Sequence, residues 1–189
     1  MAVSIGKSSR IDGRVGGRFD GRIVHTEHSY NYKLRATFMT PEVIRASARI
    51  TQIKNYLTDT ETRALVAEAE KTGDLVVMVE IDPREGSGVI PTDWLAILKE
   101  EGTSPGNSGG IRGANTPELI KCKALGGVMR RDYDYDVFWI VFTLHDEKGN
   151  PLLSGSIKKA ELIVRIYNKE GKVSWEVPDS IRAILKSAR

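Results

Sequence analysis

Three aspartates at alternate positions form the densest group of oxygen ligands in the sequence. Asp132, Asp134 and Asp136 stand in an Asp-Tyr-Asp-Tyr-Asp run just before an apolar segment. Alternate residues of a strand share one face, so the three carboxylates would converge there. Converging carboxylates repel one another unless a cation neutralises them, and Ca²⁺ prefers such hard oxygen ligands. Two interpretations follow: a Ca²⁺ site, or a solvated strand start whose aspartates pair with Arg130 and Arg131.

The other reactive side chains lack the companions that catalysis or metal binding requires. His25 and His28 have only Glu27 beside them, which gives at most the three protein ligands that a zinc site needs as a minimum. Cys122 is the single cysteine, which excludes an intrachain disulfide. Residues 102–115 are glycine-rich and are expected to form a loop, but this loop lacks the Gly-Lys-Ser/Thr ending of a phosphate-binding loop. No motif marks a catalytic residue, so the sequence favours a non-catalytic protein without deciding the matter.

Arginines recur at the start of the chain. Residues 1–22 hold five basic and two acidic side chains, and their net +3 equals the net charge of the whole chain. Two copies of an Arg-x-Asp-Gly-Arg motif stand in this segment, and guanidinium groups suit carboxylate and phosphate partners. The residues predicted to contact a partner are Arg10, Arg14, Arg18, Phe19 and Arg22.

The same segment is rich in glycine and poor in large apolar residues, which disfavours independent folding. We therefore expect residues 1–29 to form a flexible arm that orders only against a partner. The arm either docks on a neighbouring subunit or is a solvated leader without a role. The aspartate in each motif repels phosphate, which makes binding of nucleic acid the weaker alternative.

Hydropathy patterns beyond residue 30 predict the elements that would position these groups. Residues 30–38 alternate apolar and polar side chains, as in a half-buried strand. Thr40-Pro41-Glu42 is typical of a helix start, and Thr58-Asp-Thr-Glu61 matches a capping box that begins a second helix. Residues 75–79 are wholly apolar, which predicts a strand covered on both faces.

The C-terminal third shows further strand signals. Residues 137–144 are β-branched and aromatic, and residues 160–168 and 172–177 read as a hairpin with its turn at Lys169-Glu-Gly171. A short helix is expected after Pro178. The Thr-Pro-Glu sequence at residue 40 recurs at residue 116, which favours a second helix start there over a duplicated unit.

Length and composition set the fold class. A chain of 189 residues with 40% hydrophobic side chains can bury about 70% of its unfolded surface in one core. The predicted class is β-rich α+β: a mainly antiparallel sheet or β-sandwich with two or three short helices, spanning residues 30–189 as a single domain. The longest apolar run, residues 137–142, is far shorter than the roughly 20 residues of a membrane helix.

These observations lead to one expected function and two alternatives. The leading hypothesis is a non-catalytic structural or interaction module that self-associates or binds another protein through its arm. The first alternative is a ligand- or Ca²⁺-binding domain, or an enzyme, that uses segment 102–115 and the three aspartates. The second is binding of RNA or an anionic surface. Without an export signal, a cytoplasmic location is expected by default, with an exported domain as the alternative.

Overall fold

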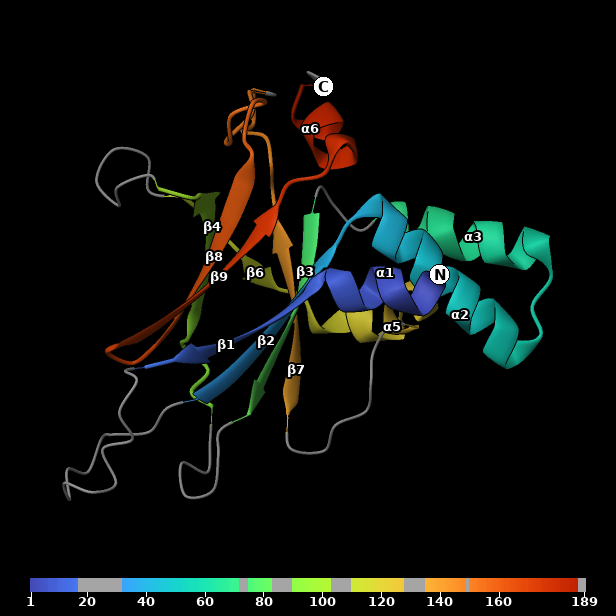
Figure 1. The fold of residues 1–189 in the computed structure, drawn as a ribbon, viewed down its shortest axis with the longest axis horizontal. Coiled ribbons are helices and arrows are strands. Elements are labelled where there is room, and N and C mark those ends of the chain that lie inside the picture. Colours follow the sequence, from blue (N-terminus) through green and yellow to red (C-terminus); the bar gives the residue numbers. More distant parts are fainter. Residues whose placement is uncertain are drawn as a thin grey trace.

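The chain forms three layers: two antiparallel sheets packed face to face and a group of helices on the outer face of one sheet (Figure 1). The computed structural model describes residues 1–16, 32–71, 75–82, 90–102, 110–127, 135–148 and 150–186. The arrangement confirms the predicted β-rich α+β class. None of the helices in these ranges is both long and apolar enough to cross a membrane.

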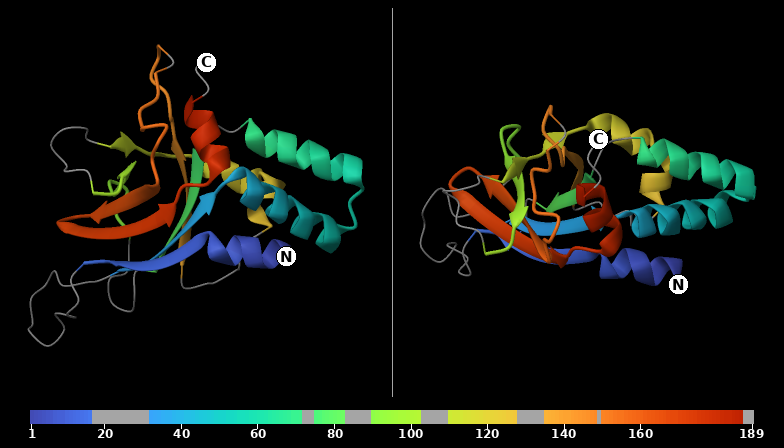
Figure 2. Two further views of the ribbon diagram at one scale, coloured as in Figure 1. Left: turned by 45° about the horizontal axis from the view of Figure 1, so that its top comes forward. Right: turned by 90° about the horizontal axis from the view of Figure 1, so that it is seen from above.

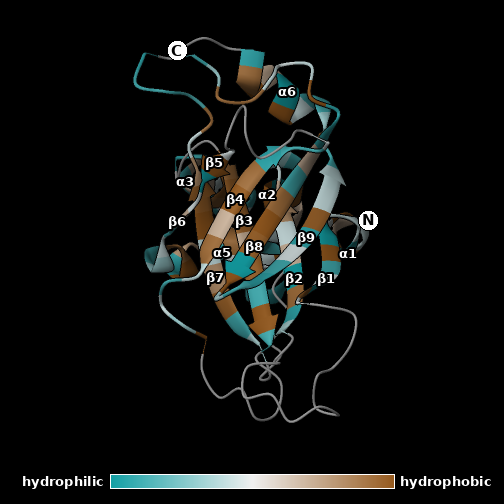
Figure 3. Cartoon of the chain, turned by 90° about the vertical axis from the view of Figure 1, so that its left-hand side faces the viewer, coloured by the Kyte–Doolittle hydropathy of each residue, from teal (hydrophilic) through white to brown (hydrophobic). Residues whose placement is uncertain are grey.

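The first sheet, here sheet A, has five strands in the order β1-β2-β3-β7-β6. Their bounds are β1 Arg10–Val15, β2 Tyr32–Met39, β3 Leu75–Asp82, β6 Ala114–Asn115 and β7 Asp136–Phe142. The second sheet, sheet B, has the order β5-β4-β8-β9. Its strands are β4 Leu95–Glu100, β5 Ile111–Arg112, β8 Lys159–Ile166 and β9 Lys169–Glu176. Figure 3 shows the alternation of hydrophobic and hydrophilic residues along these strands.

The helices lie mainly beside sheet A (Figure 2). They are α1 Ala2–Ser8, α2 Pro41–Asn55, α3 Asp59–Glu70, the 3₁₀ helix η2 Pro117–Lys121, α5 Lys123–Gly126 and α6 Asp179–Lys186. Thr40 caps α2 by accepting a hydrogen bond from the Val43 amide, and Thr58 and Glu61 form the expected capping box of α3. Local capping chemistry therefore starts both helices where the sequence predicts.

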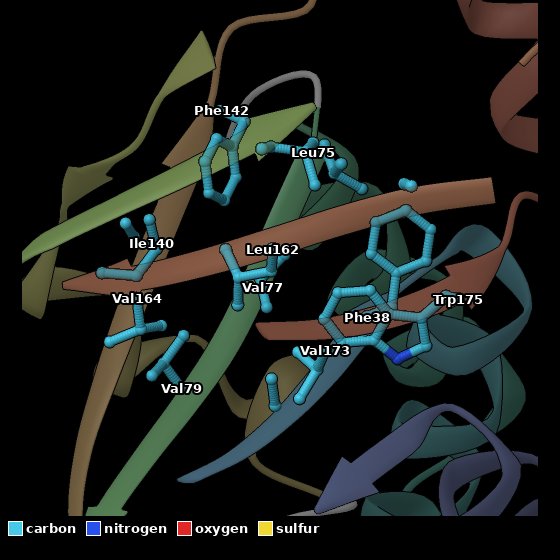
Figure 4. Close-up of a cluster of buried hydrophobic side chains, with 14 of the residues drawn as sticks. Phe38, Leu75, Val77, Val79, Ile140, Phe142, Leu162, Val164, Val173 and Trp175 are labelled. Carbon is cyan, nitrogen blue, oxygen red and sulfur yellow. The ribbon is translucent and has the colours of Figure 1, made fainter. Parts of the chain in front are cut away.

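The main core fills the space between the two sheets. It takes its side chains from the inner faces of β2, β3 and β7 and from β4, β8 and β9, with Ile181 and Leu185 of α6 packed onto the same cluster. In Figure 4, the ring of Phe38 stacks on Trp175, with 5.1 Å between their centroids. These inner faces supply the burial that holds the sandwich together.

A second core joins sheet A to the helices. Met78 and Trp139 on the outer face of the sheet pack with residues of α2, α3, η2 and α5, including Val43 and Leu125. All eight residues of β3 are consequently buried: residues 75–79, as their wholly apolar sequence predicts, and also the charged Glu80 and Asp82, which it does not. Cys122 is buried in this cluster, and burial raises the pKa of its thiol.

The start of the chain differs from the expected flexible arm. Residues 2–8 form α1, and β1 pairs with β2 in antiparallel register from Arg10 with Thr37 to Val15 with Tyr32. Val15 has no exposed surface because it joins the main core. The backbone hydrogen bonds of β1 and this burial offset the entropy that its glycine costs. For residues 1–16 the arm is corrected to a folded part of the sandwich; residues 17–31, with the expected boundary at 29, lie outside the described ranges.

The hairpin of β8 and β9 turns earlier than expected. Its turn is at Tyr167 and Asn168, and Tyr167 adopts a left-handed backbone with φ of 54°. Gly171, expected in the turn, is instead paired with Val164 inside β9. A Cβ at Gly171 would lie 2.4 Å from the carbonyl oxygen of Arg14. The glycine therefore allows β1 to approach β9 closely, which is a tertiary requirement that a local turn pattern does not reveal.

Segment 102–115, which is expected to be a loop, contributes the short strands β5 and β6 to the sandwich. Gly113 lies between β5 of sheet B and β6 of sheet A, and its amide donates to the carbonyl of Ala96 at 2.9 Å. A Cβ at Gly113 would lie 2.2 Å from Cγ2 of Ile140. Residues 110–115 thus cross from one sheet to the other, while residues 103–109 lie outside the described part of the chain.

Candidate functional site

A cavity of about 290 Å³ lies where α1, α2 and the outer face of sheet A meet. Figures 1 and 2 show α1 running alongside α2 on this side of the sheet. The described residues that line the cavity come from α1, β1, β2, α2 and β3, together with Gly127 after α5. The site therefore depends on segments that lie far apart in the sequence.

The floor of the cavity follows from strand register. Arg10 of β1 is paired with Thr37 of β2, and Thr37 is paired with Met78 of β3, so the three side chains form a row across the sheet. Glu80 stands two residues after Met78 and shares its face. The floor thus combines a guanidinium, a hydroxyl, a thioether and a carboxylate.

The walls follow from helical spacing. Val3 and Lys7 of α1 are four residues apart, as are Ile50 and Lys54 of α2, so each pair shares a helix face. Each helix presents one apolar and one cationic side chain to the cavity. Gly6, which also lines it, leaves the backbone of α1 without a side chain at that point.

In the described part of the chain, the three cations that line the cavity lack an acidic partner, whereas two cations on the same face of sheet A have one. Lys33 lies 2.9 Å from Asp82, and Arg35 lies 3.3 Å from Asp12. Within the described ranges, Lys7, Arg10 and Lys54 make no ion pair with a carboxylate. Three unneutralised positive charges around one cavity create a local positive potential that attracts anions.

Two buried polar groups complete the site. The Thr37 side chain belongs to a residue that is 2% exposed, and its hydroxyl has no hydrogen-bond partner among the residues that the structure describes. Glu80 is 3% exposed and contributes the one carboxylate of the described lining. Because Thr37 lines the cavity, its hydroxyl can exchange a hydrogen bond with a ligand that enters.

The position of α1 is fixed by the residue that follows it. The carbonyl oxygen of Ser9 accepts hydrogen bonds from the Phe38 amide at 3.1 Å and from Nε1 of Trp175 at 2.9 Å. Ser9 directly precedes Arg10, so these bonds hold the end of α1 and the first residue of β1 against both sheets. They place Lys7 and Arg10 at the cavity without using either side chain.

The predicted partner-binding arginines are only partly brought together. Arg10 lines the cavity, while Arg14 is an exposed residue of β1 paired with Lys33. Arg18, Phe19 and Arg22 lie outside the described residues. Their role in contacting a partner therefore stays a prediction.

The predicted Ca²⁺ ligands are also only partly described. Asp136 is exposed at the start of β7 and is paired with Ile81. Asp132 and Asp134 lie outside the described ranges. Within those ranges no group of three histidine, cysteine or acidic side chains is placed to hold a metal ion. The Ca²⁺ site stays a prediction because two of its three ligands lie outside the residues that the structure describes.

Sequence reasoning missed most of the cavity. Helical spacing could have shown that Ile50 and Lys54 share a face, since the start of α2 is well marked. The pairing of β1 with β2, and hence the meeting of Arg10 with Thr37, required a contact across residues 17–31 that no local pattern specifies. Lys7 gave no signal because α1 was expected to be part of a disordered arm.

The fold and the cavity together define a three-layer α+β protein with a cation-lined cavity between its helices and its sheet. Comparison of the chain with protein-family models, with curated proteins and with solved structures found no match. The function is therefore argued from the site alone.

Proposed function

We propose that this protein binds a small anionic compound in the cavity between α1, α2 and sheet A. The observation that carries the proposal is the meeting of Lys7, Arg10 and Lys54, from three different elements, around one cavity without an acidic partner in the described chain. A bound anion would form charge-assisted hydrogen bonds with these groups. It would also relieve their mutual repulsion.

The size and the lining of the cavity suit a small molecule better than a macromolecule. Its volume of about 290 Å³ is close to the lower end of ligand pockets, which span roughly 300–1,000 Å³. Val3, Ile50 and Met78 give it an apolar side, and Thr37 and Glu80 give it fixed polar groups. A mostly apolar lining with a few placed polar groups is the usual composition of a small-molecule site.

Isothermal titration calorimetry and thermal unfolding with inorganic phosphate, sulfate and acetate test this function. Binding is expected to weaken at least about tenfold in a Lys7→Gln/Lys54→Gln variant, since hydrogen bonds to charged groups contribute about 1.5–3 kcal/mol. Both lysines are exposed and unpaired within the described chain, so the variant should fold normally.

The matched control is Lys158→Gln, which removes an exposed lysine that precedes β8 of sheet B. This variant should bind the anions as the unchanged protein does. If none of the three anions binds or raises the melting temperature, the proposed function is wrong. If the double variant and Lys158→Gln lose the same affinity for the anions, binding depends on the overall charge of the protein and not on this cavity.

Self-association is a second proposal, which follows from the sequence and is supported by exposed apolar side chains on the helices. Val3 is 58% exposed and Ile53 is 62% exposed. Apolar residues on the surface favour contact with a protein when they form a patch. Light scattering over a range of protein concentrations should show a mass above that of one chain, and a Val3→Ser/Ile53→Ser variant should lower it; a single-chain mass at every concentration rejects the proposal.

A further inference from the structure

We infer that the ligand of this cavity is a small phosphomonoester whose organic group is apolar. This inference rests on the proposed function and specifies the chemical class that the site selects. The charge, the apolar lining and the volume of the cavity support it.

The charge of the cavity matches a dianion. Lys7, Arg10 and Lys54 together with Glu80 leave the described lining with a net charge of +2. A phosphomonoester carries a charge of about −1.5 to −2 at pH 7, because its second pKa is about 6. A carboxylate or a sulfonate carries −1 and would leave part of the positive potential uncompensated.

The donors of the cavity also suit a phosphoryl group. A guanidinium binds phosphate oxygens through two parallel hydrogen bonds, and lysine binds them as a point charge. Arg10 enters from the sheet, and Lys7 and Lys54 enter from the two helices, so three phosphoryl oxygens can each meet a cation. The Thr37 hydroxyl beside Arg10 offers a further hydrogen bond.

The apolar side of the cavity accounts for the organic group. Val3, Ile50 and Met78 belong to three elements and face one cavity whose volume is only about 290 Å³. That volume is many times the roughly 10–15 Å³ that one water molecule needs, which leaves room for a short organic group beside the phosphoryl group. Free phosphate would leave these apolar side chains in contact with water.

Three probes separate charge from apolar contact in calorimetric titrations. They are n-butyl phosphate, a dianion with an apolar chain; butanesulfonate, a monoanion with the same chain; and inorganic phosphate, which lacks the chain. We expect n-butyl phosphate to bind roughly tenfold more tightly than either of the other probes. Butanesulfonate lacks its second negative charge, and inorganic phosphate lacks its apolar chain. Lys54→Gln should reduce the difference in affinity between n-butyl phosphate and butanesulfonate, and Lys158→Gln should leave this difference unchanged.

The pH dependence provides an independent test. Lowering the pH from 7.5 to 5.0 converts most of the n-butyl phosphate to its monoanion, so its affinity should fall about tenfold. Butanesulfonate stays a monoanion over this range. Any change in the charge of Glu80 or of the three cations would affect both probes, so the sulfonate titration isolates the contribution of the phosphate itself.

The outcomes distinguish this inference from the proposed function. If butanesulfonate binds as tightly as n-butyl phosphate at pH 7.5, the cavity binds anions but does not select phosphomonoesters, and the inference is overturned while the proposed function stands. If inorganic phosphate binds as tightly as n-butyl phosphate, the apolar part of the inference is wrong. If no probe binds, both fail.

Discussion

Single residues in this protein show how closely its layers approach one another. Gly171 of β9 lies so near β1 that a Cβ would meet the Arg14 carbonyl oxygen at 2.4 Å and Cγ2 of Val15 at 2.9 Å. The nearer atom belongs to the backbone and cannot rotate away. An added methyl group must therefore displace a strand.

Substitution of Gly171 by alanine is expected to destabilise the fold by about 2 kcal/mol, in the range of overpacked cores. Thermal or urea unfolding measures the loss. Gly126→Ala is the matched control, because no atom lies within 4 Å of the added Cβ and alanine favours its helix. Equal stabilities of the two variants would show that β1 and β9 do not pack as described.

Glu42 makes stability depend on pH. Burial opposes ionisation of its carboxyl group, but hydrogen bonds from its own backbone amide, from Thr40 and from Ser180 outweigh this and lower its pKa below the ordinary 4.5. Ser180 donates to Glu42 at 3.0 Å and so joins α6 to α2. A lowered pKa in the folded state stabilises the protein above the unfolded pKa, and this stabilisation disappears as the pH falls through the folded value.

Replacing Glu42 with glutamine should therefore lower the melting temperature at pH 7, by a free energy below about 1 kcal/mol because the side chain is partly solvated. The difference from the unchanged protein should shrink as the pH falls below 4.5. Glu147→Gln, in an exposed turn, is the control. If the difference in melting temperature stays constant down to pH 3, ionised Glu42 is not the source of the stabilisation.

At the scale of elements, helix α2 ends at an unusual residue. Tyr56 closes it with φ of 55°, a left-handed backbone that glycine adopts without strain, and its side chain is 95% exposed. Nothing in the burial of Tyr56 therefore compensates for its backbone strain.

Tyr56→Gly should raise the free energy of unfolding by about 0.5–1 kcal/mol, since relief of strain exceeds the added entropy of the unfolded chain. Tyr56→Ala retains the strain and should change stability little. Urea unfolding of both variants gives the comparison, and a glycine variant no more stable than the alanine variant would refute the explanation.

Elements marked by local chemistry could be predicted, and those defined by distant contacts could not. Thr40 and the pair Thr58 and Glu61 mark helix starts through bonds to residues three positions away, so they are visible in the sequence. The β-branched run of β3 indicates burial by itself. In contrast, the glycine-rich composition around β1 suggested disorder, and only pairing with β2 and contact with β9 make that segment a strand.

The same distinction applies to the candidate site at the scale of the whole molecule. The sequence pointed to Arg10 as a binding residue, and the structure places it in the cavity. The sequence did not predict that Arg10 and Lys54 line the same cavity, because this depends on α1 and α2 lying side by side. The sequence shows which residues are charged, but only the fold shows that three of the cations lie around one cavity.

Deletion of the N-terminal segment tests the place of β1 in the molecule. Removing residues 1–16 should abolish cooperative thermal unfolding, because β1 covers the edge of β2 and places Val15 in the main core. Removing only residues 1–8 keeps β1 and should leave a cooperative but weaker transition. Circular dichroism during heating distinguishes the two, and a normal transition after the longer deletion would mean that the segment is a dispensable appendage.

The hydrogen bond from Trp175 to Ser9 spans 166 residues of sequence. A ribosome therefore releases the first strand long before its partner in β9 exists. Until β9 has been synthesised, β1 lacks its contacts with the second sheet and the sandwich is incomplete, so β1, although it is made early, completes its packing late.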